Sequence, residues 1–400
     1  MSHNGSNSGS DRSGGSSSGW SDSQLSYYSD EGVALVTARI KSFFDPDPRF
    51  VWEDTIGAGS NGIVYRLRYA AGTYTRRMAV KIAPMDVDLG EGYKSYIEGG
   101  PAPGEVLSLA IEKGWLQRLR GCLHVIQSLD MPADPLAQVP QGVTPHRMLN
   151  WLFMEYAENG TVTLLVERHL KMYPGELLPC RLLWRLFMCL IRAAVEMAYH
   201  DLITLDGRKV DLTMLPLEIL KSIPPGPMIH GDLHWGNMVI GAIMPDIQHP
   251  EHAVSPNIKL IDLGTARRYN HRDDKFNRTG SQRNIWEIGE IMCFLMLLKQ
   301  ENMDTVQVTV DGQTFEIWGS SMEQAREELI AAGIDPLLIG IVYCCLSHQD
   351  FARPGLIDLA MKVHDQVVNR GPNGVERETD EAIFGRVLSL IFYADTSEGF

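Results

Sequence analysis

The sequence predicts an α+β fold in which a β-rich N-terminal part precedes a larger, mainly helical part. The first observation is a series of short β-branched and aromatic runs, broken by glycine turns, between residues 50 and 84. The second is the dominance of helical segments from Thr163 onward. Among them, Leu182–His200 is apolar nearly all round, as a buried central helix is. Strands and helices in separate blocks are typical of this fold class.

Composition excludes several classes of protein. The chain has 400 residues and a formal net charge of −14, which argues against nucleic acid or an anionic membrane as a partner. Charged residues interrupt the most apolar runs, which are shorter than the roughly 20 residues of a membrane span. The six cysteines form no CxxC pair and no His-linked metal spacing. With no signal peptide in the polar N-terminus, we expect a cytoplasmic or nuclear protein with buried thiols that is not secreted.

The two ends of the chain differ in character from its middle. Residues 1–30 are rich in Ser, Gly, Asn and Asp and offer no apolar face, so we expect a disordered tail. A short amphipathic helix is expected over Val33–Phe44, and Asp45-Pro-Asp-Pro48 ends it. The C-terminal segment Asn369–Phe400 includes an expected helix at Glu381–Tyr393, to which the sequence assigns no role.

The first block of strands carries a glycine turn. We expect strands at Phe50–Ile56, Ile63–Tyr69 and Arg77–Ile82, with Gly57-Ala-Gly-Ser-Asn-Gly62 joining the first two. A dinucleotide-binding fold would follow these glycines with a helix, whereas a β-branched strand follows here. The backbone N–H groups of such a flap can close over phosphates. Lys81 interrupts the third strand, where it either meets anionic partners on the inner face or points outward to solvent.

The next segments complete the β-rich part. Residues 85–104 read as a loop rich in Gly, Pro and acidic residues, and a helix is expected over Glu105–Leu119. Two apolar strands, His124–Ser128 and Leu149–Glu155, follow on either side of a Pro-rich loop. The second strand runs into a glycine turn, Met154-Glu-Tyr-Ala-Glu-Asn-Gly160.

Two polar motifs stand among the expected helices. The first is His230-Gly-Asp-Leu-His-Trp-Gly-Asn237, in the loop of the strand–loop–strand unit Met228–Ile240. The second is Asp262-Leu-Gly264, which ends the apolar strand Ile258–Ile261. Asp and Asn are common turn formers, so each motif also has a purely structural interpretation. A rigidly held carboxylate and amide also suit phosphoryl transfer, where one orients a hydroxyl and the other holds a metal ion.

Together these motifs resemble the protein-kinase superfamily over about residues 50–365. The glycine turn, Val64 and Ala79-Val-Lys81 look like its nucleotide-binding part, and His230–Asn237 looks like its catalytic loop. Asp262-Leu-Gly264 resembles the metal-binding Asp-Phe-Gly, with Leu263 in place of Phe. The resemblance implies a two-lobed protein-kinase-like fold with a tail (1–30), an N-terminal helix or extension (31–49), a small β-rich N-lobe with one main helix (50–155), a larger mainly α-helical C-lobe (156–368) and a C-terminal extension (369–400).

The resemblance also implies ATP and Mg²⁺ as ligands and assigns roles to residues. Lys81 would neutralise phosphate charge while a helix glutamate holds it; Glu105 and Glu112 compete for that place, and Glu112 fits the spacing better. Asp232 would position the attacking hydroxyl, with Lys81 and Asn237 as the other catalytic residues. Asn237 and Asp262 would hold the magnesium ion. The nucleotide would contact Ile56, Gly57, Gly59, Gly62, Val64, Ala79, Lys81, Glu112, Met154, Glu155, Ala157 and Val239.

Several residues depart from the family pattern. Gly231 stands where most protein kinases carry an Arg that grips a phosphorylated activation loop, so we expect no such switch. Asn284 replaces the Asp that begins the helix buttressing the catalytic loop. The segment between Gly264 and Asn284 is also short, so the platform for a peptide substrate is shortened or missing. No Ala-Pro-Glu is present to pair with Arg353. His234 replaces a Lys, and His-Gly-Asp-Leu-His also occurs in kinases of aminoglycosides and choline.

Three functions compete. The first is an ATP- and Mg-dependent phosphotransferase acting on serine or threonine hydroxyls of a protein, which the glycine turn and Ala79-Val-Lys81 favour. The second is the same chemistry on a small-molecule hydroxyl, which the short segment and His230–His234 favour. The third is a pseudokinase that serves as a binding scaffold; it predicts the loss of a key residue, and none is lost. The conformation of residues 264–284 separates the first two, because this segment either builds a peptide shelf or closes around something small.

Overall fold

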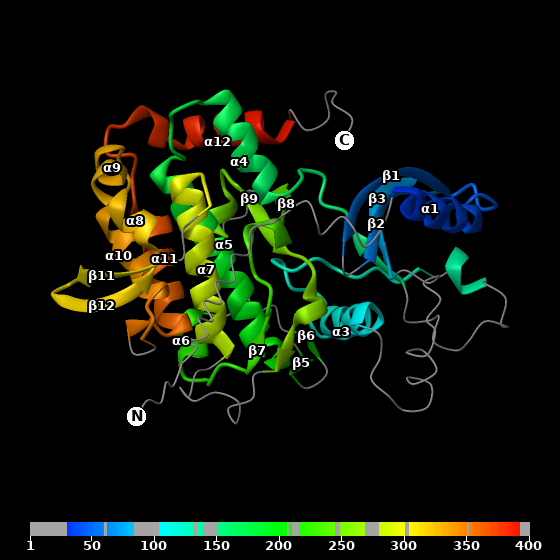
Figure 1. The fold of residues 1–400 in the computed structure, drawn as a ribbon, viewed down its shortest axis with the longest axis horizontal. Coiled ribbons are helices and arrows are strands. Elements are labelled where there is room, and N and C mark those ends of the chain that lie inside the picture. Colours follow the sequence, from blue (N-terminus) through cyan, green and yellow to red (C-terminus); the bar gives the residue numbers. More distant parts are fainter. Residues whose placement is uncertain are drawn as a thin grey trace, which may run out of the picture.

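A computed structural model of the chain describes residues 30–59, 62–83, 104–131, 134–138, 151–202, 204–205, 208–209, 216–244, 249–268, 280–300, 304–349 and 352–392. The fold is mixed α+β, as expected, with a four-stranded antiparallel sheet and many helices. The sheet and helix α1 lie at one end of the molecule and most helices at the other (Figure 1). The tail expected over residues 1–30 lies outside the described residues except for Asp30.

The N-terminal sheet has the strand order β1-β2-β3-β4. Its strands alternate side chains between two faces, and the face under α1 closes a core of aromatic and branched residues. Phe44, at the end of α1, meets Phe50 and Phe153 edge-on at centroid distances of 5.3 and 6.3 Å. The elements are α1 (Asp30–Phe44), β1 (Phe50–Gly59), β2 (Gly62–Ala71), β3 (Tyr74–Ile82) and β4 (Trp151–Glu155).

Helix α3 (Gly104–Arg118) lies near the other end of the sheet and leads into an irregular segment. The strand expected at His124–Ser128 is wrong. This segment forms only isolated bridges, from Val125 to Leu260 and from Ser128 to Met154. Because it changes partner within a few residues, it cannot form a continuous ladder with either neighbour. It nonetheless connects β4 to the strand that precedes Asp262.

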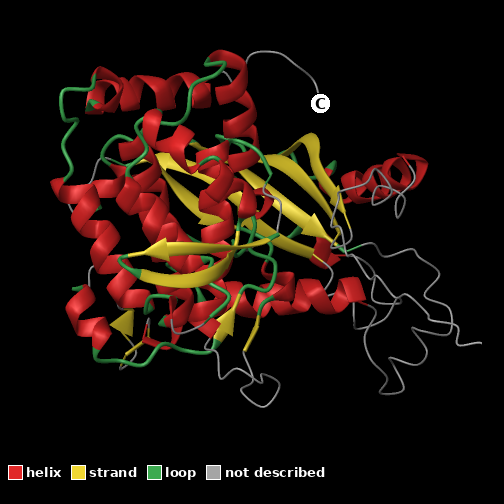
Figure 2. Ribbon diagram, turned by 60° about the vertical axis from the view of Figure 1, so that its left-hand side comes forward, coloured by secondary structure: helices red, strands yellow, loops and turns green. Residues whose placement is uncertain are grey.

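The helical part is built around α5 (Cys180–Ala198), in which every side chain except Arg181 is buried. This arrangement confirms the central helix expected from the apolar run, and helices make up most of this part of the molecule (Figure 2). The other helices are α4 (Val162–Met172), α6 (Leu217–Lys221), α7 (Gly280–Leu297), α8 (Ser320–Gln324), α9 (Arg326–Ala331), α10 (Pro336–Cys345), α11 (Leu356–Asn369) and α12 (Asp380–Phe392), with 3-10 turns η2 (Pro135–Gln138), η4 (His200–Leu202), η6 (Trp235–Asn237), η7 (Pro250–His252), η8 (Leu263–Thr265) and η11 (Glu376–Glu378).

Within the described part of the chain, four short two-stranded sheets supplement the helices. The loop expected over residues 241–257 is wrong in part, because β8 continues to Ile243 and η7 and the start of β9 lie within it. The pair β11–β12 was not expected at all, although its strands alternate and Asp311-Gly312 joins them. The pairs are β5 (Thr204–Leu205) with β6 (Arg208–Lys209), β7 (Met228–Ile229) with β10 (Arg267–Arg268), β8 (Met238–Ile243) with β9 (Pro256–Leu260), and β11 (Thr305–Val310) with β12 (Gln313–Trp318).

Two expectations drawn from composition can be compared with the structure. No helix among the described residues combines the length and the apolar character needed to cross a bilayer. All six cysteines are free thiols; five are buried and Cys344 is partly buried. The buried thiols expected from the sequence are therefore present.

Candidate functional site

Lys81 links three segments that are far apart in the sequence. Its ammonium group lies 2.7 Å from Glu112 Oε2 on α3 and 2.8 Å from Asp262 Oδ1 after β9. The Lys81 side chain is 6% exposed and that of Glu112 is 1% exposed. Burial opposes the charge on Lys81, but the two carboxylates outweigh it and raise its pKa. Lys81 thus meets anionic partners on the inner face of β3, and the partner on α3 is Glu112; the side chain of Glu105 lies outside the described residues.

The loop between β7 and β8 holds Asp232 and Asn237 in contact. Asn237 Nδ2 donates to Asp232 Oδ2 at 3.1 Å and to the Asp232 carbonyl at 2.8 Å. His234 Nε2 lies 3.8 Å from Asp232 Oδ2, and the proximity of this imidazole lowers the pKa of the Asp232 carboxyl. The Asp232 side chain is 49% exposed. The loop therefore presents an ionised, accessible carboxylate beside an amide.

Buried neutral groups fix the backbone of this loop. His230 Nε2 donates to the Ile261 carbonyl at 3.1 Å, so its Nδ1 accepts from the Asp232 N–H at 3.4 Å. Burial lowers the pKa of His230 to about 4, which keeps the ring neutral at pH 7. Asn284, on α7, accepts from the His230 N–H and donates to the Met228 carbonyl, both at 3.1 Å. The Asn284 amide thus makes both hydrogen bonds, one as acceptor and one as donor, whereas an ionised carboxylate at this position could only accept.

The segment that follows Asp262 packs tightly against the same loop. Asp262 has a φ of 61°, a left-handed conformation that is strained for a residue other than glycine. A Cβ on Gly264 would lie 2.0 Å from Ser108 Oγ, and one on Gly231 would lie 2.8 Å from the Thr265 carbonyl. Trp115 donates its Nε1–H to the Ala266 carbonyl at 2.9 Å. Close packing from α3 and the 230–237 loop therefore sets the position of the Asp262 carboxylate.

The structure also brings Asn237 and Asp262 close to each other. The Ile261 N–H donates to the Asn237 carbonyl at 3.0 Å, and Met238 pairs with Leu260 between β8 and β9. The polar residues expected at the site therefore gather between the N-terminal sheet and the β8–β9 hairpin. They are Lys81, Glu112, Asp232, Asn237 and Asp262.

The residues expected to contact a nucleotide lie on the sheet and around it. Gly57 and Gly59 are in β1, Gly62 begins β2, and residues 60–61 lie outside the described residues. A Cβ on Gly62 would lie 2.5 Å from the Ile82 carbonyl. Close packing against β3 is therefore by itself enough to require a glycine at this position. Ile56 is exposed. Val64 and Ala79 are on β2 and β3, Met154 and Glu155 end β4, Ala157 follows it, and Val239 is on β8.

Sequence reasoning missed two features near these residues. Lys259, on β9, lies 2.7 Å from Glu155 Oε1, which also accepts from the Gln127 N–H at 2.9 Å. On α7, burial raises the pKa of Glu287 to about 7 and that of Glu290 to about 8. The charge of Asp232 contributes to the shift at Glu287. The spacing of the two glutamates on one helix was visible in the sequence, but their burial was not.

Two expectations about the segment after Gly264 have different outcomes. Residues 269–279 lie outside the described residues, so the shape of the full 264–284 segment stays open. Its first part forms β10, which pairs with β7 directly before the 230–237 loop. Arg353 donates to backbone carbonyls, those of Ser347 at 2.9 Å and Gln282 at 3.5 Å. Its guanidinium is thus held without an Ala-Pro-Glu glutamate.

No protein-family model matches the sequence, and a search of curated proteins finds no match either.

Proposed function

We propose that the chain is an ATP- and Mg-dependent phosphotransferase with a two-lobed protein-kinase-like fold. The observation that carries the proposal is the position of Lys81, which lies between the carboxylates of Glu112 and Asp262. A buried ammonium group between two carboxylates is costly as a purely structural device, because both kinds of charge lose their hydration. In a nucleotide site the same group has a task, which is to neutralise the charge of phosphates.

The donor set fits a magnesium ion. Asp262 offers a carboxylate whose side chain is 23% exposed, and Asn237 commits its Nδ2 to Asp232, which leaves the amide oxygen to face a ligand. Magnesium prefers such hard oxygen ligands and binds through few protein groups together with substrate phosphates. Bound there, the ion would screen the charge of the transferred phosphoryl group. Lys81, Asp262 and Asn237 would hold the nucleotide and metal in position.

Asp232 would orient the substrate hydroxyl and accept its proton as the oxygen attacks the terminal phosphorus. Its lowered pKa keeps it ionised at pH 7, and its exposure leaves it open to substrate. Asn237 and His234 fix the carboxylate from two sides. Positioning of this kind is what phosphoryl transfer requires from a protein.

The acceptor is proposed to be a serine or threonine hydroxyl of a protein, with a small hydroxylated molecule as the second candidate. One observation favours the second candidate. On α7, the charge of Asp232 contributes to raising the pKa of Glu287 to about 7, so a cationic amine of a substrate bound near Asp232 would favour the ionised form of Glu287. At position 231 the left-handed backbone and the nearby Thr265 carbonyl leave no room for an arginine, which supports a site without phosphorylation control.

Nucleotide binding is tested by a thermal-shift titration of the full chain with ATP and MgCl₂. We expect a rise in melting temperature that needs both components and is lost in Asp262→Asn and Lys81→Met. Lys221→Met is the matched control, because it removes a lysine of α6 that pairs with Asp358 on α11, and neither residue belongs to the proposed nucleotide site. A wild-type chain that shows no shift would overturn the proposal and favour a binding scaffold.

Phosphoryl transfer is tested with γ-labelled ATP, first on mixed protein substrates and then on amine-bearing and simple hydroxylated metabolites. Asp232→Asn is expected to lower turnover by about 10³-fold while leaving the ATP-dependent thermal shift in place. Label on serine or threonine supports the first candidate. Label only on small molecules supports the second. ATP binding without any transfer supports the pseudokinase.

A further inference from the structure

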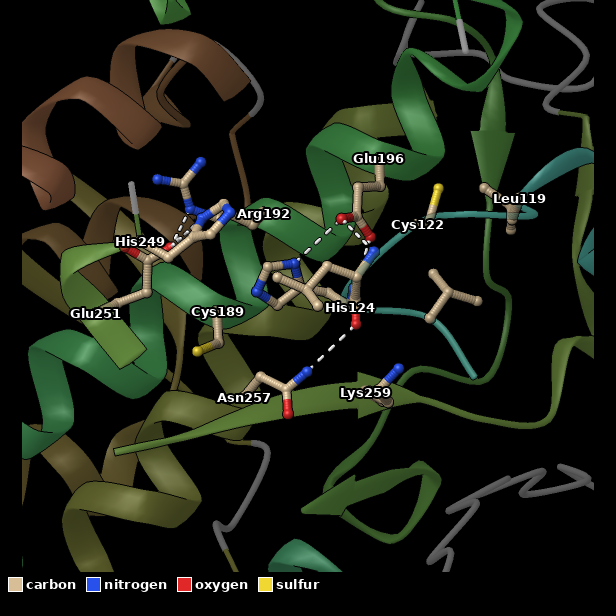
Figure 3. A network of polar contacts seen from close by, with 12 residues as sticks. Leu119, Cys122, His124, Cys189, Arg192, Glu196, His249, Glu251, Asn257 and Lys259 are labelled. Atoms are coloured by element: carbon tan, nitrogen blue, oxygen red, sulfur yellow. Dashed lines mark hydrogen bonds and ion pairs between the residues drawn. The ribbon is translucent and has the colours of Figure 1, made fainter. Parts of the chain in front are cut away.

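A second cluster of buried polar residues lies where α5 meets the 3-10 turn η7. His249, Glu251 and His252 lie within four consecutive residues, whereas His124 and Cys189 come from distant segments, so the cluster as a whole is visible only in the structure. Two overlapping groups have ligand atoms within 4.8 Å of one another: His124 with Cys189 and His252, and His249 with Glu251 and His252. All five residues are buried. Figure 3 shows Arg192, His249 and Glu251 on one side of the cluster and His124 with Glu196 on the other.

The first group is satisfied by hydrogen bonds alone. Glu196 accepts from the His124 Nδ1–H at 3.1 Å, so the lone pair of His124 is on Nε2. His252 Nε2 lies 3.2 Å from that atom and must carry the proton between them. The lone pair of His252 is then on Nδ1, 3.7 Å from Cys189 Sγ, which can donate its thiol proton. This chain of donors and acceptors needs no ion.

The second group is not satisfied in this way. His249 Nδ1 and Glu251 Oε2 are buried, and neither has a hydrogen-bond partner. The Glu251 side chain is 0% exposed, and Arg192 Nε holds its other oxygen, Oε1. His249 Nδ1 lies 3.8 Å from Glu251 Oε1, too far for a hydrogen bond. Two unpartnered buried atoms on neighbouring residues are costly unless something binds them.

We propose that His249, Glu251 and His252 bind a divalent transition-metal ion of the zinc class. Two imidazoles and one carboxylate are an established ligand set for such ions. Ligand bonds of about 2.1 Å place neighbouring ligand atoms of a tetrahedral site about 3.4 Å apart. The 3.8 Å from His249 Nδ1 to Glu251 Oε1 places this carboxylate beside the ring, and its unpartnered oxygen, Oε2, would be the one that binds the ion. His252 would bind through Nδ1, the nitrogen that carries its lone pair, and Cys189 would give up its hydrogen bond or become a fourth ligand.

The surroundings supply what such a site needs. The Nε2–H of His252 donates to His124, which donates in turn to Glu196, so a carboxylate orients a metal-binding histidine through a second ring.

The metal ion would hold η7 against α5 and against β9, the strand that follows η7. This is a structural role, separate from the magnesium site proposed around Asp262. It reaches that site through β9, because Leu260 donates to the His124 carbonyl and accepts from the Ile126 N–H, both at 2.9 Å. Metal binding would therefore stabilise the segment that carries Asp262.

The test begins with the full wild-type chain, purified without a histidine tag and analysed by plasma mass spectrometry. We expect about one zinc ion per chain. Dialysis against a chelator should remove the ion and lower the melting temperature. One equivalent of ZnCl₂ should restore that temperature, and MgCl₂ should not. A chain that carries no zinc and gains no stability from added ZnCl₂ overturns the proposal.

Variants then locate the site. Glu251→Gln and His249→Asn are expected to weaken zinc binding by at least about 100-fold. His169→Asn is the matched control, because His169 Nδ1 is also buried without a hydrogen-bond partner but belongs to no metal-binding group among the described residues. Asp262→Asn should keep its zinc, which separates this site from the nucleotide site. Unchanged zinc content in Glu251→Gln would overturn the assignment; if the variants fail to fold, the wild-type titration decides.

Discussion

Breaking the Lys81–Glu112 ion pair is expected to lower the stability of the fold by different amounts, depending on which of the two residues is replaced. Lys81→Met leaves the Glu112 carboxylate, 1% exposed, without its cation. Glu112→Gln leaves Lys81 with Asp262, whose Oδ1 is 2.8 Å away, and with a side-chain amide that can still accept. The cost of a broken pair is set by the charge left behind, so the first change should destabilise the fold more than the second.

The size of each effect follows from these surroundings. Removing one partner of a buried ion pair costs about 3–5 kcal/mol, and the lower end applies to Lys81→Met because Glu112 can take up a proton. Glu112→Gln turns a charged hydrogen bond into a neutral-acceptor bond, a loss of about 1 kcal/mol. The double variant carries no stranded carboxylate at position 112, and the Asp262 carboxylate that also loses Lys81 is partly exposed, so it should be more stable than Lys81→Met alone.

The Lys81→Met variant should also acquire a characteristic pH dependence. Burial raises the pKa of Glu112, and removing the lysine removes the group that opposes that rise. In the folded variant, Glu112 then keeps its proton up to a higher pH than it does in the unfolded chain. Its stability deficit should therefore be largest at pH 8 and should narrow as the pH falls toward 5.

Urea unfolding followed by tryptophan fluorescence and circular dichroism, at pH 8 and pH 5, measures these differences. Lys221→Met serves as a control, since the side chains of Lys221 and its partner Asp358 are 58% and 55% exposed and such an exposed pair contributes less than about 1 kcal/mol. Equal losses in Lys81→Met and Glu112→Gln at both pH values would refute the reasoning. So would a double variant whose loss is the sum of the two single losses.

Three further predictions concern the surroundings of the 230–237 loop. Gly231→Ala places a side chain at a φ of 86° and against the Thr265 carbonyl, so it should cost at least about 1–2 kcal/mol in urea unfolding, whereas Gly57→Ala, with open space around it, should cost less than that. Asn284→Ala leaves the buried His230 N–H and Met228 carbonyl without their partner; a loss of about 1–3 kcal/mol is expected, and an unchanged urea midpoint would contradict the buttress. Burial raises the pKa values of Glu287 and Glu290 to about 7 and about 8, so the folded state holds protons that the unfolded state has lost. Stability should then fall as the pH rises from about 4.5 to above 8. Glu287→Gln should reduce this slope, as measured by urea midpoints at pH 6 and 8.5.

The sequence predicted the features that local pattern encodes. The apolar strand interrupted by one lysine left an inward and an outward position open for Lys81, and the family resemblance favoured Glu112 over Glu105 as its partner; the structure pairs Lys81 with Glu112. The central helix followed from an apolar run too long and too uniform for a surface helix. The β11–β12 hairpin was equally visible, since its residues alternate and Asp311-Gly312 marks the turn. It was missed because helices were expected throughout this region.

Other features depend on contacts that no local pattern encodes. His124 and His252 are 128 residues apart, and only the packing of η7 on α5 brings their rings together. The segment at His124–Ser128 has the composition of a strand but divides its bonds between Leu260 and β4, so it joins neither as a full strand. The double role of Asn284 is hidden for the same reason, because its two partners lie on another element.

The distribution of exposure across the site bears on what the site is for. Groups that only hold the backbone are neutral and buried: His230 and Asn284 are both 0% exposed. The charged groups instead run from buried Glu112, through Lys81 and Asp262, to Asp232 at 49% exposed. A purely structural ion-pair network pays a desolvation cost for each buried charge and has no use for an accessible member. A substrate site instead requires buried charges that are held in place and a carboxylate that solvent and substrate can reach.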